Sequence, residues 1–133
     1  MTPATKRRSH TEHQCALRAE HLDMLRHMLG INVADRRNPP EYRNYACTNP
    51  GDATMRALQA AGMVLKYRIG NGYEWWTATD AGMAAARASQ RAMLKPKAAR
   101  VYARFLDVSD ALPDLTFEQF LTSPEFAETR RDA

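Results

Sequence analysis

Apolar side chains recur every three or four residues in the first quarter of the chain, which is the spacing of one face of an α-helix. This stripe contains Leu17, Leu22, Met24, Leu25, Met28 and Leu29. Thr11 and Gln14 match the capping box, in which two side chains bond to backbone amides of the first turn. Gly30 tolerates the left-handed conformation that often ends a helix. We therefore predict a helix that begins at Thr11 and ends at Gly30.

The next segment contains helix breakers and a short apolar pattern. Pro39 and Pro40 lack backbone donors, so no helix is expected to cross them. Over Glu41–Cys47 the apolar side chains fall at helical spacing, and we predict one or two helical turns there. The sequence Asn-Pro-Gly at residues 49–51 then indicates a turn.

The middle of the chain combines a short helix, a hairpin and a further helix. Asp52 is a good cap for a helix that runs to about Gly62. Val64–Ile69 and Tyr73–Thr77 contain the β-branched and aromatic residues typical of strands. The Asn-Gly pair between them favours a type I′ turn, because both central residues of that turn need positive φ. We predict a β-hairpin at this position.

The last third of the chain predicts helices. The predicted elements are a helix from Thr79 to about Met93, a helix from Lys97 to about Asp110, a short helix capped by Thr116 and Gln119, and a last turn that begins at Ser123-Pro124. The first of these is rich in alanine, and such a face allows close helix packing in a scaffold or a homodimer. The predicted fold class is therefore mostly α with one β-hairpin.

Two phrases around the hairpin resemble a known family. Residues 57–64 (ALQAAGMV) resemble the end of a winged-helix recognition helix, and residues 75–82 (WWTATDAG) resemble the closing strand and helix start of such domains. The resemblance implies a winged helix-turn-helix-like core, in which Glu41–Cys47 would be the supporting helix. It divides the chain into a basic tail (1–10), a winged-helix-like domain (11–94) and a C-terminal helical extension (95–133).

The whole chain also resembles short uncharacterised proteins of bacteriophage and prophage genomes. The phrases that carry this resemblance are Tyr42-Arg43-Asn44-Tyr45, Thr79-Asp80-Ala81-Gly82, Tyr102-Ala103-Arg104-Phe105-Leu106 and Leu115-Thr116-Phe117-Glu118-Gln119-Phe120-Leu121. It implies a mobile-element context and says nothing of a mechanism; the order of helix, hairpin and helix together with the basic body leads us to expect a regulatory protein that binds nucleic acid. A winged helix also serves as a protein-binding module, so the resemblance by itself does not choose between DNA and protein partners.

Charge is unevenly distributed along the 133 residues. Residues 1–106 hold 17 Lys/Arg against 8 Asp/Glu, whereas residues 107–133 hold 2 against 7. A basic body favours polyanions through phosphate neutralisation, although a solvated surface explains the same charge equally well. No apolar run approaches the roughly 18 residues of a membrane span, and Met1–His10 has no signal-peptide pattern. We expect a cytoplasmic chain with no membrane partner and with Cys15 and Cys47 reduced.

For DNA binding, the helix at residues 53–61 should present polar side chains to the major groove. The candidate nucleic-acid-binding residues are Thr54, Arg56 and Gln59 on this helix, Lys66, Arg68 and Asn71 on the hairpin, and Lys6, Arg7 and Arg8 in the tail. Burial of Met55, Leu58 and Gly62 leaves a surface rich in alanine around Arg56. Such a surface favours backbone-led DNA binding, or a protein partner such as a host complex.

The remaining candidate chemistry is sparse. Lys97, Arg100 and Arg104 align as one basic stripe, which is also what an ordinary surface helix presents. His10, His13, Cys15 and His21 do not repeat at zinc-site spacing, so no metal and no cofactor is predicted. No phosphate loop, nucleophile elbow or paired acidic residues suggest catalysis, and we predict a non-enzymatic protein.

Overall fold

Helices flank a small antiparallel sheet in the first of two units into which the chain divides. The computed structural model describes residues 17–133. Within them, the first unit comprises residues 17–32 and 40–90, and the second comprises residues 33–39 and 91–133. The observed combination of helices with an antiparallel hairpin agrees with the predicted fold class.

The first described helix, α2 (Ala19–Leu29), begins later than the sequence pattern predicts. Leu17 and Arg18 precede it, and the backbone amide of Arg18 donates to Nδ1 of His21 at 3.0 Å. Thr11 and Gln14 lie outside the described residues. The predicted end is confirmed, because Gly30 takes a φ of 76° directly after the helix.

The prediction of a helix over Glu41–Cys47 is wrong. Residues 41–45 have no regular secondary structure, and β1 (Ala46–Thr48) pairs with a later strand. The Asn44 side chain donates to the Ala78 carbonyl at 3.2 Å and accepts from the Ala78 amide at 2.8 Å, which aligns β1 with the sheet. Two long-range backbone partners outweigh the weak helical preference of a segment rich in tyrosine and asparagine.

Helix α3 (Ala53–Ala60) is positioned by its cap and its buried side. The Asp52 carboxylate accepts from the Met55 amide at 3.0 Å, as the sequence predicts. Met55 and Leu58 are fully buried. Gly62, which we expected to face the core, is exposed and takes a φ of 76° in the turn that leaves the helix.

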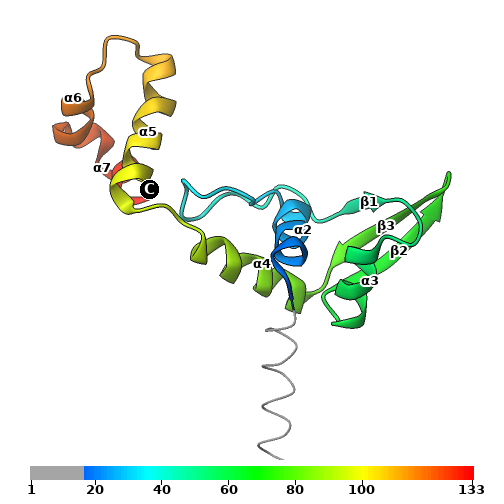
Figure 1. Cartoon of the computed structure of the whole chain (residues 1–133). Helices are drawn as coiled ribbons and strands as arrows, with labels where there is room; N and C mark the ends of the chain where they lie inside the picture. The colour runs from blue at the N-terminus through cyan, green and yellow to red at the C-terminus, as the bar shows by residue number, and fades with distance from the viewer. Residues whose placement is uncertain (1–16) are drawn as a thin grey trace, which may run out of the picture. The chain divides into compact units, whose positions relative to one another are not determined.

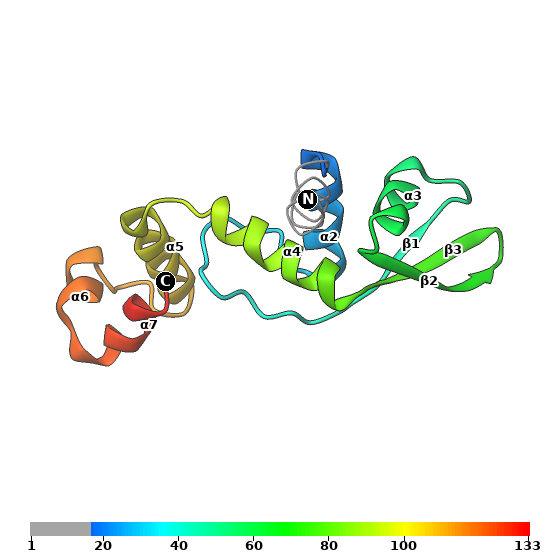
Figure 2. The same cartoon turned by 90° about the horizontal axis from the view of Figure 1, so that it is seen from below.

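Three antiparallel strands form the sheet in the order β1-β3-β2. The predicted hairpin is confirmed as β2 (Val64–Gly70) and β3 (Tyr73–Ala78), and its tip projects beyond α3 in both views (Figure 1 and Figure 2). Asn71 and Gly72 both have positive φ, at 54° and 78°, as a type I′ turn requires. A register shift between Lys66 and Arg68 leaves Tyr67 as an extra residue in β2.

Helix α4 (Asp80–Ala92) follows β3 directly and closes the core of the first unit. The Thr79 hydroxyl accepts from the Gly82 amide at 3.1 Å, which confirms Thr79 as the predicted cap. The buried core consists of Leu25, Met28, Leu29, Ile31, Ala46, Met55, Leu58, Met63, Val64, Trp76, Ala78 and Ala86. Helices α2, α3 and α4 therefore share one core with a single face of the sheet.

The second unit contains α5 (Lys97–Ala111), α6 (Phe117–Thr122), the 3₁₀ turn η1 (Pro124–Phe126) and α7 (Ala127–Arg131). The capping box of Thr116 and Gln119 is confirmed, with both bonds present. A chain of ring contacts joins Tyr102, Phe105, Phe117, Phe120 and Phe126 at centroid distances between 5.1 and 5.8 Å. This aromatic cluster holds the short helices of the second unit together.

Candidate nucleic-acid interface

The outer side of α3 carries two exposed polar side chains, Arg56 and Gln59. Burial of Met55 and Leu58 fixes the rotation of the helix, so the outward direction of these side chains is determined by the core. Thr54 is half-buried at the start of the helix. The rest of the exposed surface is alanine, so α3 offers one guanidinium and one amide that can donate to bases or phosphates.

The two basic residues of the hairpin differ in their surroundings. The Lys66 ammonium lies 2.6 Å from a carboxylate oxygen of Glu74, and 5.5 Å from the centre of the Trp76 ring. The Arg68 guanidinium instead lies 5.9 Å from the centre of the Trp75 ring. The charge of Lys66 is neutralised within the fold, whereas that of Arg68 remains available to a phosphate. Asn71 is exposed at the tip.

Glu74 connects the sheet to the turn that precedes α3. Its side chain is nearly buried and accepts from Lys66 and, at 3.1 Å, from the Gly51 backbone amide. The Lys66 hydrogen bond is the main cause that lowers the pKa of this carboxyl below its ordinary value, and the Gly51 amide adds to it against the opposing effect of burial. The ionised carboxylate thus holds β2, β3 and the 49–51 turn in one arrangement.

We predict that the stability of the first unit falls in acid partly through Glu74. Because its pKa is lower in the folded than in the unfolded protein, ionised Glu74 stabilises the fold above the ordinary carboxyl pKa of about 4.3, and this stabilisation disappears as the pH falls through the folded pKa. The Glu74→Gln variant should show a flatter dependence of the urea midpoint on pH between about pH 7 and pH 3.

The exposed Glu118 in the second unit provides a matched control. With unfolding followed by tryptophan fluorescence, Glu118→Gln should keep the wild-type dependence of the urea midpoint on pH. The pKa of Glu41 is also lowered, through its hydrogen bonds with Arg87. The slope of the urea midpoint against pH should therefore be smaller in Glu74→Gln than in the wild type, but it should not be zero. An unchanged slope would contradict the assigned role of Glu74.

Two aromatic rings that our sequence reasoning did not select, Tyr45 and Trp75, lie on the sheet face opposite the helices, and Tyr42 and Arg43 lie beside the end of α2. The Tyr45 ring lies 6.2 Å from the Trp75 ring, centre to centre, at an angle of 37°. The Arg43 guanidinium lies 5.4 Å from the centre of the Tyr42 ring and 5.9 Å from that of Tyr45. With Arg68 beyond Trp75, these side chains form a row, Tyr42–Arg43–Tyr45–Trp75–Arg68, which we call the aromatic–arginine row.

The pairing of β3 with both of its neighbours brings this row together, and Arg68 lies opposite Trp75 in the register of β2 with β3. Cys47 lies opposite Trp75 in the register, so the strand that follows Tyr45 is aligned beside Trp75. The sequence signal was the Tyr-Arg-Asn-Tyr phrase at 42–45, which we interpreted as part of a helix. The alternation of side chains along β3 was a second signal in the sequence, because it places Trp75 and Trp76 on opposite faces of the sheet.

The predicted basic stripe on α5 is not a free surface. Arg100 donates to the Lys95 carbonyl at 2.6 Å. The Arg104 side chain is 12% exposed and lies 3.7 Å from Asp35 and 3.0 Å from Asp107. Of the three residues, Lys97 is exposed and the two arginines hold the second unit together.

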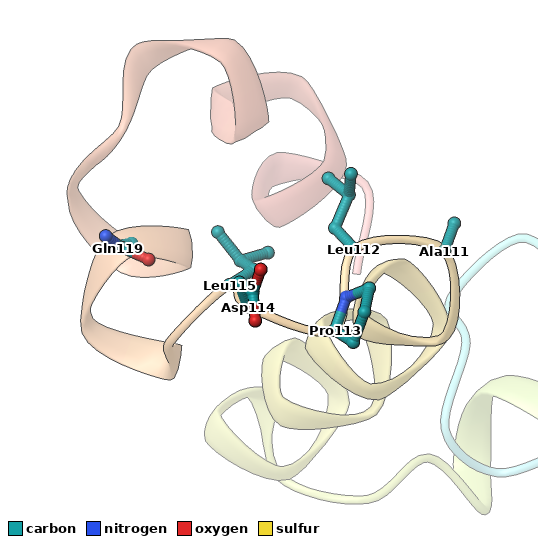
Figure 3. A pocket seen from close by; sticks show the side chains of 6 residues that line it. All are labelled: Ala111, Leu112, Pro113, Asp114, Leu115 and Gln119. Atoms are coloured by element: carbon teal, nitrogen blue, oxygen red, sulfur yellow. The ribbon is translucent and has the colours of Figure 1, made fainter.

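A hollow of about 390 Å³ lies at the turn between α5 and α6 (Figure 3). Its lining comes from the end of α5, the turn and α6, and consists of Ala111, Leu112, Pro113, Asp114, Leu115 and Gln119. The Gln119 side-chain oxygen accepts from the Thr116 amide, so it is occupied as a helix cap. Asp114 is the one ionisable side chain of this lining, and a single carboxylate gives no acid–base pair.

The structure does not describe some of the candidate residues, and its described part holds neither a cluster suited to a metal ion nor a helix suited to span a membrane. Lys6, Arg7, Arg8, His10, His13 and Cys15 lie outside the described residues. Within residues 17–133, no three His, Cys, Asp or Glu side chains gather in a way that could hold a metal ion. No helix in the same range has both the length and the apolar character needed to cross a membrane.

Comparison with known proteins gives no relative on which a function could be based. No protein-family model, no curated protein and no solved structure matches this chain.

Proposed function

We propose that this chain is a small non-enzymatic protein of winged-helix type that acts in the cytoplasm, binds nucleic acid, and serves a regulatory role of the kind found in bacteriophages. The order α2, β1, α3, β2, β3 and the sheet order β1-β3-β2 support the winged-helix description. One helix, α3, lies between β1 and β2, so the supporting helix of a helix-turn-helix is replaced by an extended segment.

The observation that carries the proposal is the arrangement of Arg56 and Arg68. Arg56 is exposed on a helix whose Met55 and Leu58 lie in the same core as the hairpin that carries Arg68. A helix and a wing held by one core can contact base edges and backbone phosphates together. Gln59 and Asn71 add neutral donors next to these charges, and Lys6–Arg8 provides further positive charge.

The test is fluorescence anisotropy with a labelled random-sequence duplex at several salt concentrations. Each phosphate contact contributes about −0.9 to the slope of log K against log salt, so Arg56 and Arg68 alone predict a slope near −2, and the tail makes it steeper. Absence of salt-sensitive binding at micromolar protein would contradict the proposal.

We predict that Arg56→Gln makes this slope shallower by about 1 and weakens duplex binding. If Arg56 also contacts a base, the substitution should reduce the binding free energy by about 1–3 kcal/mol, and the reduction should depend on the sequence of the duplex. Arg131→Gln is the matched control, since Arg131 is an exposed arginine of the second unit. Equal effects of the two substitutions would show that α3 has no special part in binding.

A protein partner is the second candidate, and one observation favours it. Strand β2 lies at an edge of the sheet, and its side chains Leu65, Tyr67 and Ile69 are exposed. An edge strand with apolar side chains is a template for an added strand from another chain. This candidate would be favoured if the chain captures a host protein, if Leu65→Lys abolishes that capture, and if the chain shows no salt-sensitive binding of DNA.

A further inference from the structure

We propose that the open face of the sheet binds single-stranded nucleic acid. Unpaired bases stack on Tyr45 and Trp75, and the guanidinium groups of Arg43 and Arg68 contact phosphates on either side of these rings. This inference extends the proposed nucleic-acid function and shares Arg68 with it, but its other residues lie away from α3, on or beside the open face of the sheet.

The register defines this face. Residues directly opposite each other in neighbouring strands share a face, and Trp75 lies opposite both Cys47 in β1 and Arg68 in β2. Trp76, the next residue, lies opposite Ala46 and Lys66 and is 1% exposed in the core. The helices therefore cover the Trp76 side, while Cys47 and Leu65 on the Trp75 side are exposed.

The charge on the open face is complementary to a phosphate backbone. Arg43 and Arg68 stand at the two ends of the ring pair formed by Tyr45 and Trp75. Among the described residues that the register places on this face there is no carboxylate, because Glu74 points to the helix side with its partner Lys66. An anionic ligand is thus attracted to both ends of the row without repulsion between them.

The Tyr45 ring is exposed, the Trp75 ring is half-buried, and the position of Tyr45 is held by its neighbour. Tyr45 is 45% exposed, and Tyr73, on the same side of β3 as Trp75, is also exposed. The side chain of Asn44 is bonded to the Ala78 backbone, so the position of its neighbour Tyr45 is fixed before any ligand binds. The Arg43 bonds to the His27 carbonyl use Nε and Nη2, which leaves Nη1 for a phosphate.

Stacking selects unpaired bases over a duplex. The faces of a base are available to an aromatic side chain only when the base is unstacked from its neighbours, as in a single strand. Every base has such a face, so binding of this kind tolerates many sequences. Tyr, Trp and Arg also dominate protein interfaces, and a protein ligand is therefore the alternative that the experiment must exclude.

The experiment uses the full chain and oligo(dT) and oligo(U) of about 12 nucleotides, within the 4–16 that comparable stacking platforms cover. Tryptophan emission and the anisotropy of a labelled oligonucleotide are measured together. Binding should quench the emission of Trp75, because bases contact its ring. A Trp75→Phe variant should keep the anisotropy change and lose the quench, since the remaining Trp76 is buried.

Tyr45→Leu removes one ring while it keeps apolar bulk, and we predict about tenfold weaker binding of both oligonucleotides. The control is Tyr102→Leu, because Tyr102 is a tyrosine of similar exposure in the second unit. Arg68→Gln, on the exposed hairpin, tests the same face without altering a ring and should make the salt slope shallower by about 1. Trp75→Phe, which keeps a ring at this position and loses the quench, keeps the proposal testable if Tyr45→Leu fails to fold.

The outcomes separate this inference from the proposed function. Quenching that Tyr45→Leu weakens and Tyr102→Leu leaves unchanged supports stacking on the open face, and the two oligonucleotides show whether DNA or RNA is preferred. No binding of either oligonucleotide, or binding without quenching that only Arg56→Gln weakens, overturns it. Loss of duplex binding with the quench retained would refute the α3 proposal and leave the stacking face standing.

Discussion

Replacing Trp76 with alanine is expected to lower the free energy of unfolding of the first unit by about 3–5 kcal/mol. The side chain is 1% exposed, and it is the largest fully buried side chain of the core. Its indole N–H donates to the Thr48 hydroxyl at 2.9 Å, so the substitution removes both packing and a bond between β3 and β1. Because small domains are stable by about 5–15 kcal/mol, the variant should be close to unfolding.

The adjacent tryptophan is the matched control for this prediction. Trp75 is half-buried on the open face, so Trp75→Ala should cost much less than Trp76→Ala. Both tryptophans lie in the first unit, and each variant keeps one of them as a fluorescent probe for urea unfolding. Equal losses in the two variants would contradict the assignment of Trp76 to the core and Trp75 to the surface.

Gly82→Ala is expected to destabilise the first unit, although alanine is the better helix former. Gly82 is the third residue of α4, and inside a helix the change from glycine to alanine gains up to about 1 kcal/mol from helix propensity. A methyl group at this position, however, would overlap the backbone carbonyl oxygen of Met63. That oxygen accepts from the Thr79 amide at 2.9 Å, so it cannot move away without breaking the bond that starts α4.

Overpacking of this kind costs about 1–3 kcal/mol or more. Because backbone atoms must move here, we expect the free energy of unfolding to fall by an amount near the upper end of that range. Thermal unfolding followed by tryptophan fluorescence measures it. Ala84→Ser adds one atom on an exposed side of the same helix and should leave the midpoint almost unchanged. A midpoint of Gly82→Ala at or above that of the wild type would show that α4 does not pack as closely as described.

The segment before β1 shows why sequence reasoning placed a helix where there is none. Tyr42 and Tyr45 are three residues apart, which fits one helical turn as well as it fits two contacts of an extended chain. In the structure the Tyr42 ring packs over Gly30, and Tyr45 lies beside Trp75. Both partners are distant in sequence, so local periodicity carried no information about them.

The candidate site shows the same limit for charged residues. Lys66 and Arg68 are equivalent in the sequence, as basic residues alternating with apolar ones in one strand. The register shift at Tyr67 sends Lys66 towards Glu74 on the helix side and Arg68 towards Trp75 on the open side. Arg104 likewise matches a surface stripe by spacing, yet it is paired with Asp35 from a segment far away in the chain.

By itself, the sequence determined the local elements of this protein: the end of α2 at Gly30, the cap of α3 at Asp52, the Asn-Gly turn of the hairpin and the caps at Thr79 and Thr116. Each depends on the conformational preference or hydrogen bonding of residues within a few positions of one another. Tertiary structure decided which tryptophan is buried, which basic residues remain available and that β1 is a strand. β1 and Arg104 depend on partners far away in the chain, and Lys66 and Arg68 depend on the register across the hairpin, so only the packed chain brings these partners together.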